Sequence, residues 1–235
     1  MQTIYTIGYA TKTIESFVEA LKANGITSVV DVRTSPFSAT FPMFNRDALK
    51  TALKQYGIAY LSFADEFGAR RSEPYVYVDS FDLKSELPVK RVSFEKVYEL
   101  DVFQHGVARI QDAYEKGHRV CFLCSEKAPS DCHRFIMVAS YFNRLGFQIE
   151  NIVSPTENWS FDKTISVLCD EMEREEARFR RKHPGVGEIH LLGEADSDFE
   201  VFMDCFFRSK GTPQERALKY GNLKIGYAEG ELQND

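Results

Sequence analysis

The sequence predicts an α/β fold: a three-layer domain in which a mainly parallel sheet carries helices on both faces, followed by a C-terminal helical extension. Short apolar runs alternate with amphipathic helical patterns from the N-terminus to about residue 155. Such alternation favours a parallel sheet with right-handed crossovers. The runs around Val29 and Val120 are continuously apolar, as in strands that are buried on both faces. We therefore expect one domain over residues 1–155, with residues 156–235 packed on it as the helical extension.

Three strands are expected in the first half of the chain, over residues 3–8, 26–32 and 58–61. Thr13 is an N-cap candidate for a helix that ends at Asn24-Gly25, and a second helix is expected over residues 45–56. Residues 62–92 contain several aromatic residues but no clear periodicity. Long segments of this kind inside a compact domain are usually functional or disordered, and the aromatic residues favour an ordered lid.

The second half begins with a helical pattern over residues 93–116, which has His105-Gly106 as its weakest point. A strand over residues 120–123 leads into a helix that is expected to start near Ser130, because Pro129 and Ser130 are typical of helix starts. This start places Cys132, His133 and Arg134 in the first helical turn. A strand over 148–153 and a charged helix over 170–182 complete the prediction.

Composition restricts the classes of protein to which this chain can belong. The chain has 235 residues, of which 43% are hydrophobic and 27% charged, with a formal net charge of −6. No apolar run approaches the roughly 18 residues that a membrane span needs, so no membrane partner is expected. The N-terminus enters a strand pattern without a signal peptide, which favours a cytoplasmic location and free thiols for the five cysteines. The negative charge argues weakly against nonspecific binding to nucleic acid.

Polar side chains follow three of the expected strands, and the carboxyl ends of neighbouring parallel strands meet at one edge of a sheet, where ligands bind in open α/β folds. We expect a cleft at this edge. The candidate catalytic residues are Asp31, Cys124, Glu126, Cys132 and His133, and the candidate ligand-binding residues are Gly8, Tyr9, Arg33, Arg70, Arg71 and Arg134. Guanidinium groups recognise phosphate and carboxylate in a bidentate manner, so the expected ligand is a small anion.

Three motifs also carry a resemblance to a known family. They are Thr6-Ile7-Gly8, Asp31-Val32-Arg33-x-x-Pro36 and Cys124-x-Glu126-x5-Cys132-His133-Arg134. In this order they resemble the domain of unknown function 488 (DUF488) family over roughly residues 1–155. Members usually carry Gly-His-Ser or Gly-His-Thr after the first strand, where this chain has Gly8-Tyr9-Ala10. The resemblance implies no biochemical function, so the chemistry has to be argued from the residues.

The Cys124, Cys132 and His133 group is open to four interpretations. Thiolate and imidazole suit zinc or iron, but the spacing matches no standard zinc site, and adjacent helical residues point about 100° apart. No metal is therefore assigned. Cys132 or Cys124 could instead be a nucleophile whose pKa is lowered by the helix N-terminus and Arg134. The group could also brace the turn, or it could bind a ligand without thiol chemistry.

Two classes of function follow from these residues. The first is an enzyme that acts on a small anionic, nucleotide-like substrate, with Glu126 or Asp31 as general base and a cysteine or His133 assisting. The second is a non-catalytic module that binds a nucleotide or nucleic acid through its arginines and aromatic residues. A buried ion pair between Asp31 and Arg33 would serve as a structural brace in either class. The sequence specifies neither a cofactor nor an oligomeric state.

Overall fold

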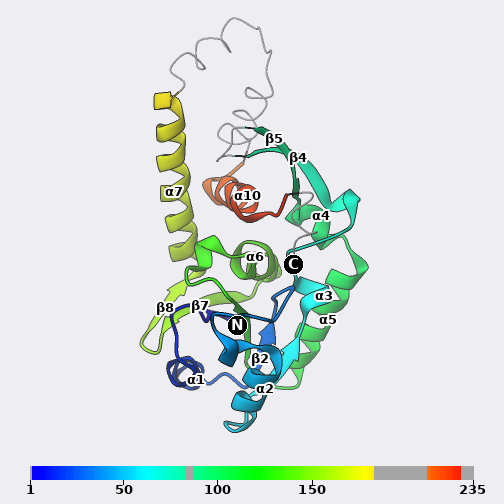
Figure 1. The fold of residues 1–235 in the computed structure, drawn as a ribbon, viewed down its shortest axis with the longest axis vertical. Helices are drawn as coiled ribbons and strands as arrows, with labels where there is room; N and C mark the ends of the chain where they lie inside the picture. The colour runs from blue at the N-terminus through cyan, green and yellow to red at the C-terminus, as the bar shows by residue number, and fades with distance from the viewer. Residues whose placement is uncertain (1, 83–86, 183–210, 229–235) are drawn as a thin grey trace, which may run out of the picture.

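The computed structural model describes residues 2–82, 87–182 and 211–228, which form an α/β fold around a six-stranded sheet (Figure 1). The strands are β1 (Thr3–Gly8), β2 (Ser28–Asp31), β3 (Ala59–Ser62), β6 (Val120–Cys124), β7 (Gln148–Ser154) and β8 (Glu157–Ser160). Their order is β3-β2-β6-β1-β7-β8, and every neighbouring pair is parallel except β7 and β8. The mainly parallel sheet is confirmed, with one strand more than the sequence patterns predicted.

Helices cover both faces of the sheet, as predicted. On β6, Cys121 and Leu123 pack into one buried cluster with α1 (Ile14–Ala23) and α2 (Arg46–Lys54). The intervening Val120 and Phe122 pack into a second cluster with α5 (Asp101–Glu115) and α6 (Ser140–Arg144). Successive strand residues point to opposite faces, so a continuously apolar strand such as β6 needs a helical layer on each side.

The predicted boundaries of α1 are confirmed. The Thr13 side chain accepts a hydrogen bond from the Ser16 backbone, while the Ser16 side chain accepts one from the Thr13 backbone, which forms a capping box. At the other end Gly25 has a φ of 63°, the left-handed region in which glycine has no steric penalty. Both ends of α1 therefore follow from local chemistry that is visible in the sequence.

Residues 62–92 contain regular elements although their sequence shows no clear periodicity. This segment contains α3 (Ala64–Phe67), the 3-10 turn η2 (Pro74–Val76) and an antiparallel hairpin of β4 (Tyr77–Asp82) and β5 (Leu87–Val92). The Tyr77 hydroxyl donates a 2.6 Å hydrogen bond to the Arg71 carbonyl, which ties the hairpin to the loop before it. Pro88 in β5 and the polar residues of β4 obscure the strand pattern, because proline and aspartate are uncommon in strands.

The helical pattern over residues 93–116 also breaks at a different place. It forms α4 (Phe94–Tyr98) and α5, with the break at Leu100, which has the extended φ and ψ of −71° and 134°. The predicted weak point, His105-Gly106, lies inside α5. Gly106 is buried there. A Cβ atom at this position would lie 2.7 Å from the Glu66 Cβ and 2.8 Å from the Phe67 ring, so only glycine fits without displacing them. The glycine therefore allows α5 to pack closely against α3.

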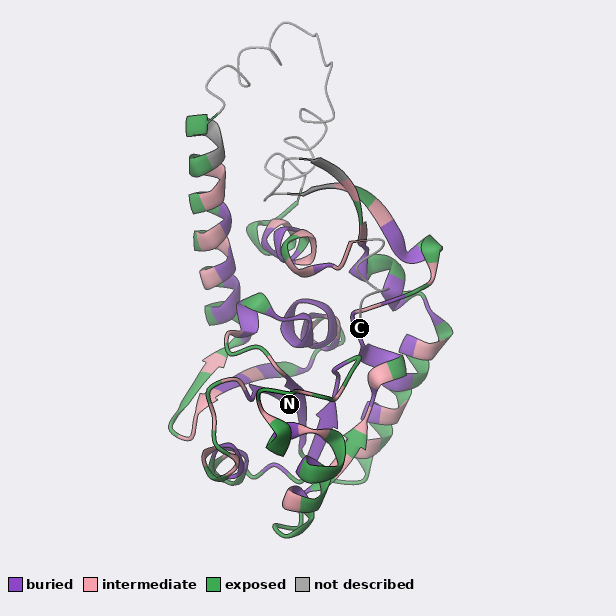
Figure 2. Ribbon diagram, in the orientation of Figure 1, coloured by how far each residue is buried: buried purple, intermediate pink, exposed green. Residues whose placement is uncertain are grey.

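The stretch after β6 starts its helix later than predicted. The 3-10 turn η3 (Pro129–Asp131) is followed by Cys132 in an extended conformation, with φ −140° and ψ 137°. The helix proper consists of η4 (Arg134–Ala139), which has π-helical hydrogen bonding, and then α6. Every residue of η4 is buried (Figure 2). Cys132 therefore lies before the helix, a correction that changes the direction of its side chain.

The described part of the C-terminal region consists of β8, α7 (Phe161–Lys182) and α10 (Pro213–Ile225), and residues 183–210 and 229–235 lie outside the described structure. α7 starts nine residues before the predicted helix at 170, and β8 extends the sheet past Pro155. α7 and α10 pack together and are bridged by Lys224, whose Nζ lies 2.7 Å from Glu171. In the described segments, every helix falls short of the length and apolarity needed to cross a bilayer. The boundary at 155 stays a prediction.

The packing of Gly106 leads to a test in which helix propensity and packing give opposite expectations. Alanine is favoured over glycine inside a helix by about 1 kcal/mol. We nevertheless expect Gly106→Ala to lower the free energy of unfolding by about 1–3 kcal/mol, because the added methyl overpacks the contact with Phe67. Ala108→Gly, at an exposed position on the same helix, should also be destabilising, by about 1 kcal/mol. Urea denaturation that finds Gly106→Ala stabilising would contradict this packing.

Candidate functional site

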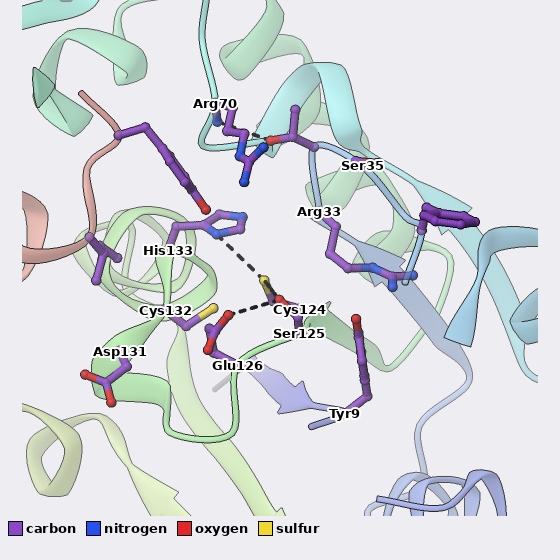
Figure 3. A pocket seen from close by; sticks show the side chains of 14 residues that line it. Tyr9, Arg33, Ser35, Arg70, Cys124, Ser125, Glu126, Asp131, Cys132 and His133 are labelled. Atoms are coloured by element: carbon purple, nitrogen blue, oxygen red, sulfur yellow. Dashed lines mark hydrogen bonds between the residues drawn. The ribbon is translucent and has the colours of Figure 1, made fainter. Parts of the chain in front are cut away.

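A cavity of about 600 Å³ opens at the carboxyl ends of the central strands (Figure 3). Tyr9 follows β1, Arg33 follows β2, and Cys124 ends β6, so the three strand ends that were predicted to converge line one cavity. Of the predicted site residues, the cavity is lined by Tyr9, Arg33, Arg70, Cys124, Glu126, Cys132 and His133, whereas Gly8, Asp31, Arg71 and Arg134 are outside its lining. The catalytic and ligand-binding roles of all of them stay predictions.

Cys124 and His133 form a close pair inside this cavity. The Cys124 Sγ lies 3.7 Å from the His133 Nδ1, and Figure 3 shows the ring facing the sulfur. The other ring nitrogen, Nε2, lies 2.8 Å from the Val32 carbonyl oxygen. A carbonyl only accepts hydrogen bonds, so Nε2 carries the proton and Nδ1 of the neutral ring has a lone pair directed at Cys124. The ring can therefore act as a base, or as a metal ligand, toward the thiol.

Cys132 completes a cluster of three donor atoms. The sulfurs of Cys124 and Cys132 and a ring nitrogen of His133 all lie within 4.8 Å of one another. The argument that adjacent residues diverge by about 100° holds only inside a helix, and Cys132 has an extended backbone. The two consecutive side chains consequently converge. Four cysteines in the described structure, at positions 121, 124, 132 and 169, carry free thiols, and Cys205 lies outside the described residues.

The two thiols of the cluster have different proton affinities. A hydrogen bond from Cys132 lowers the pKa of Cys124 to about 7, against the opposing effect of burial and with help from the charge of Arg134. Burial and the neighbouring Cys124 raise the pKa of Cys132. The pair therefore favours a Cys124 thiolate that is held by the protonated Cys132.

Arg33 occupies the β2 side of the cavity through a buried ion pair. Its Nε lies 2.8 Å and its Nη2 2.5 Å from carboxylate oxygens of Asp31, which also accepts a 2.7 Å hydrogen bond from the Tyr60 hydroxyl. Burial lowers the pKa of Arg33, but the hydrogen bonds and charge of Asp31 outweigh this effect and raise it. Asp31 is fully buried and has its acceptors occupied. Its geometry thus suits a brace, and its assignment as general base has no supporting contact in the cavity.

The ion pair leaves one donor of Arg33 unused. The whole residue is only 4% exposed. Within the described segments, its Nη1 is buried and has no hydrogen-bond partner. A buried donor without a partner costs about 1–3 kcal/mol. An acceptor that enters the cavity, such as an oxygen of an anionic ligand, would remove this cost.

Arg134 points to the loop after β6. It is 1% exposed, and its guanidinium donates to the carbonyls of Glu126 at 2.7 Å and Lys127 at 3.2 Å. Gly8 permits this loop to lie against β1, because a Cβ at that position would come within 1.7 Å of the Glu126 carbonyl oxygen. Both residues therefore position the loop that carries Glu126, and their assignment as ligand-binding residues stays a prediction without a cavity contact.

Arg70 and Arg71 are separated by the fold. Arg71 is buried, and its guanidinium donates to the carbonyls of Asp65 and Glu66, at 2.8 Å each. Arg70 lines the cavity, with its guanidinium carbon 4.7 Å from the centre of the Tyr227 ring. Of this pair, Arg70 therefore has the guanidinium placed for contact with a ligand.

Sequence reasoning missed several residues that line the cavity. Thr34, Ser35 and Phe37 come from the loop after β2, and Ile225 and Tyr227 come from the end of the described chain. The loop could have been found from its position directly after Arg33. No signal in the sequence pointed to Tyr227, because it reaches the cavity through the docking of α10.

The model of one family, described as "Domain of unknown function DUF488", matches residues 13–141. This match covers more than half of the 235 residues and includes the motifs around Asp31 and Cys132. Neither the curated proteins nor the solved structures gave a match.

The placement of Arg134 outside the cavity lining leads to a test of its role as a brace. We expect Arg134→Met to lower the free energy of unfolding by at least about 3 kcal/mol, because it removes two partly buried charged hydrogen bonds to loop carbonyls, each contributing roughly 1.5–3 kcal/mol. Arg70→Met, which removes the same group from the cavity wall, should cost less than about 1 kcal/mol. Urea denaturation of both variants measures the difference, and equal losses would contradict the brace.

Proposed function

The chain belongs to the DUF488 family, and from this premise we propose that it is an enzyme that acts on a small anionic substrate in the cavity described above. The cluster of Cys124, Cys132 and His133 is its reactive centre. The family description specifies no activity, so the proposal depends on the site. The observation that carries it is the contact of the Cys124 sulfur with the unprotonated His133 nitrogen in a cavity that also contains guanidinium groups.

The Cys124 and His133 pair supports catalysis more than passive binding. A thiol paired with a base whose other nitrogen is held by a third group has the arrangement of an activated reactive group. Here the third group is the Val32 carbonyl, which fixes the tautomer. A purely structural role would not require the lone pair of the ring to face a cavity.

Positive charge on the cavity wall supports an anionic substrate. Arg33 contributes its free Nη1 and Arg70 contributes a guanidinium that rests against Tyr227. Planar guanidinium groups recognise phosphate and carboxylate oxygens with two parallel hydrogen bonds. Glu126, which is exposed and lines the same cavity, is then available for proton transfer to or from the bound molecule.

An aromatic side chain favours a nucleotide-like molecule among the small anions. Phe37 lines the cavity although 69% of its surface is exposed. A large exposed ring at the mouth of a cavity offers a stacking surface for a base, which contributes about 1–3 kcal/mol in single-stranded nucleic-acid complexes. The same feature also favours the alternative of a non-catalytic module that binds a nucleotide or nucleic acid.

A substrate panel of phosphate monoesters, phosphodiesters and nucleotides tests the proposal, with binding and product release measured separately. We expect His133→Gln to lower kcat by at least about 100-fold, since positioned acid–base groups contribute about 10²–10⁴-fold. His105→Gln, on the exposed face of α5, is the matched control and should leave kcat unchanged. Binding without product release would support the non-catalytic alternative, and no binding by the whole panel would contradict both functions.

Arg70 provides a separate test of substrate charge. We expect Arg70→Met to weaken binding of the ligand found in the panel by at least about tenfold, because one charged hydrogen bond contributes roughly 1.5–3 kcal/mol. Arg178→Met, on the exposed side of α7, removes the same charge away from the cavity and should leave affinity unchanged. Equal affinities for the two variants would rule out Arg70 as an anion-binding group.

A further inference from the structure

We propose that Cys124, Cys132 and His133 form a zinc site whose fourth coordination position faces the cavity. This inference rests on the proposed function, because it specifies the chemistry of the same reactive centre: with zinc bound, Cys124 and His133 would be metal ligands instead of a thiol and its base. Zinc is bound in proteins by thiolate sulfur and imidazole nitrogen, and catalytic zinc sites have three protein ligands and leave the fourth position to water or substrate. Two cysteines and one histidine are one of the known ligand sets of that kind.

The distances fit such a site. With zinc–sulfur bonds of about 2.3 Å and zinc–nitrogen bonds of about 2.0–2.1 Å, tetrahedral geometry puts sulfur and nitrogen roughly 3.6 Å apart and two sulfurs roughly 3.8 Å apart. The Cys124 sulfur and the His133 Nδ1 lie 3.7 Å apart. All three donors lie within 4.8 Å of one another, so even the widest pair has to approach by only about 1 Å to reach the geometry of bound zinc.

The backbone explains why three residues so placed can share one ion. Cys124 is the last residue of β6, and the loop held by Arg134 returns the chain to the same point at Cys132. Cys132 is extended while His133 has helical φ and ψ of −62° and −24°. This change of conformation between adjacent residues directs both side chains to one side, which a continuous helix would prevent.

The orientation of His133 is the one that zinc requires. Histidines that bind metals almost always donate their second ring N–H to a carbonyl, a carboxylate or water, which fixes the ring and leaves the first nitrogen free for the metal. The Val32 carbonyl, 2.8 Å from Nε2, is such a partner. The Nδ1 that remains is the nitrogen that faces Cys124.

Charge balance favours a divalent cation at the cluster. Cys124 and Cys132 are 3% and 1% exposed. Metal ligands must be deprotonated, so binding of zinc would release the proton of Cys132 and leave two buried thiolates whose charge needs compensation. Zinc would neutralise both. Arg33 and Arg70, which line the same cavity, would hold a phosphate or carboxylate with one oxygen at the open position. The ligand class of the site is therefore water or an anionic oxygen.

Metal analysis of the full chain tests the site directly. Protein purified with a reductant and without chelators should contain about one zinc ion per chain. After removal of zinc, titration with Co²⁺ should produce a thiolate-to-cobalt charge-transfer band in the near ultraviolet and the intense visible bands of tetrahedral cobalt. Protein that is isolated without zinc and gives no charge-transfer band would overturn the site.

A matched pair of cysteine variants locates the ligands. We expect Cys132→Ser to raise the dissociation constant of zinc by at least about 100-fold, since loss of outer-shell partners alone costs about 10–100-fold. Cys169→Ser, at a half-buried thiol on α7, should leave zinc affinity unchanged. Equal affinities in the two variants would overturn the assignment.

Alkylation of the parent protein covers the case in which Cys132→Ser does not fold. Iodoacetamide should modify Cys124 and Cys132 only after zinc is removed by a chelator, whereas Cys169 should react equally with and without zinc. Modification of the first two thiols that is independent of the chelator would overturn the site. Zinc binding without turnover of any substrate would support the site and contradict the proposed enzyme. Turnover by the zinc-free protein would support the proposed enzyme and contradict zinc as part of its reactive centre.

Discussion

The buried guanidinium of Arg134 is the interaction on which the site depends. It holds the carbonyls of Glu126 and Lys127, and so fixes the loop that carries the chain from Cys124 to Cys132. The loop can lie this close to β1 only because Gly8 has no side chain in its way. Without this brace, the seven-residue loop between the two cysteines would be free to move. Nothing would then hold both sulfurs beside His133. The convergence of the donors is thus a consequence of hydrogen bonds from one buried side chain to the loop backbone.

A second buried arginine, Arg33, lines the cavity and is held by an ion pair instead of by loop carbonyls. Arg33 is held by Asp31, which is held in turn by the Tyr60 hydroxyl. Taking two charges out of water is costly, and such a pair contributes little net stability unless its geometry is good. Here the arrangement fixes one cationic group beside the cavity with a donor to spare. The pair is therefore better understood as positioning charge than as stabilising the fold.

Much of the fold follows from local sequence patterns. The elements that the sequence did not predict depend on contacts between residues that are distant in the chain. The capping box at Thr13 and the apolar run of β6 are decided by neighbouring residues, so the sequence predicts them well. The β4–β5 hairpin depends on pairing across the segment, and the burial of Gly106 depends on Phe67. The same division explains the site. The strand ends could be predicted to meet and Asp31 to pair with Arg33, but the role of Arg134 depends on loop carbonyls that no spacing reveals.

The cavity is not confined to the part of the chain that matches the family. Residues 13–141 match, yet Tyr9 on one side and Ile225 and Tyr227 on the other line the cavity. Lys224 forms ion pairs with both Asp131, in the loop after β6, and Glu171 on α7. This contact joins the end of the described chain to the loop that leads into the donor cluster. The proposed reactive centre lies within the matched residues, whereas part of the cavity wall comes from outside them. Under the proposed function, selectivity among anionic substrates would therefore depend on segments that the family match does not cover.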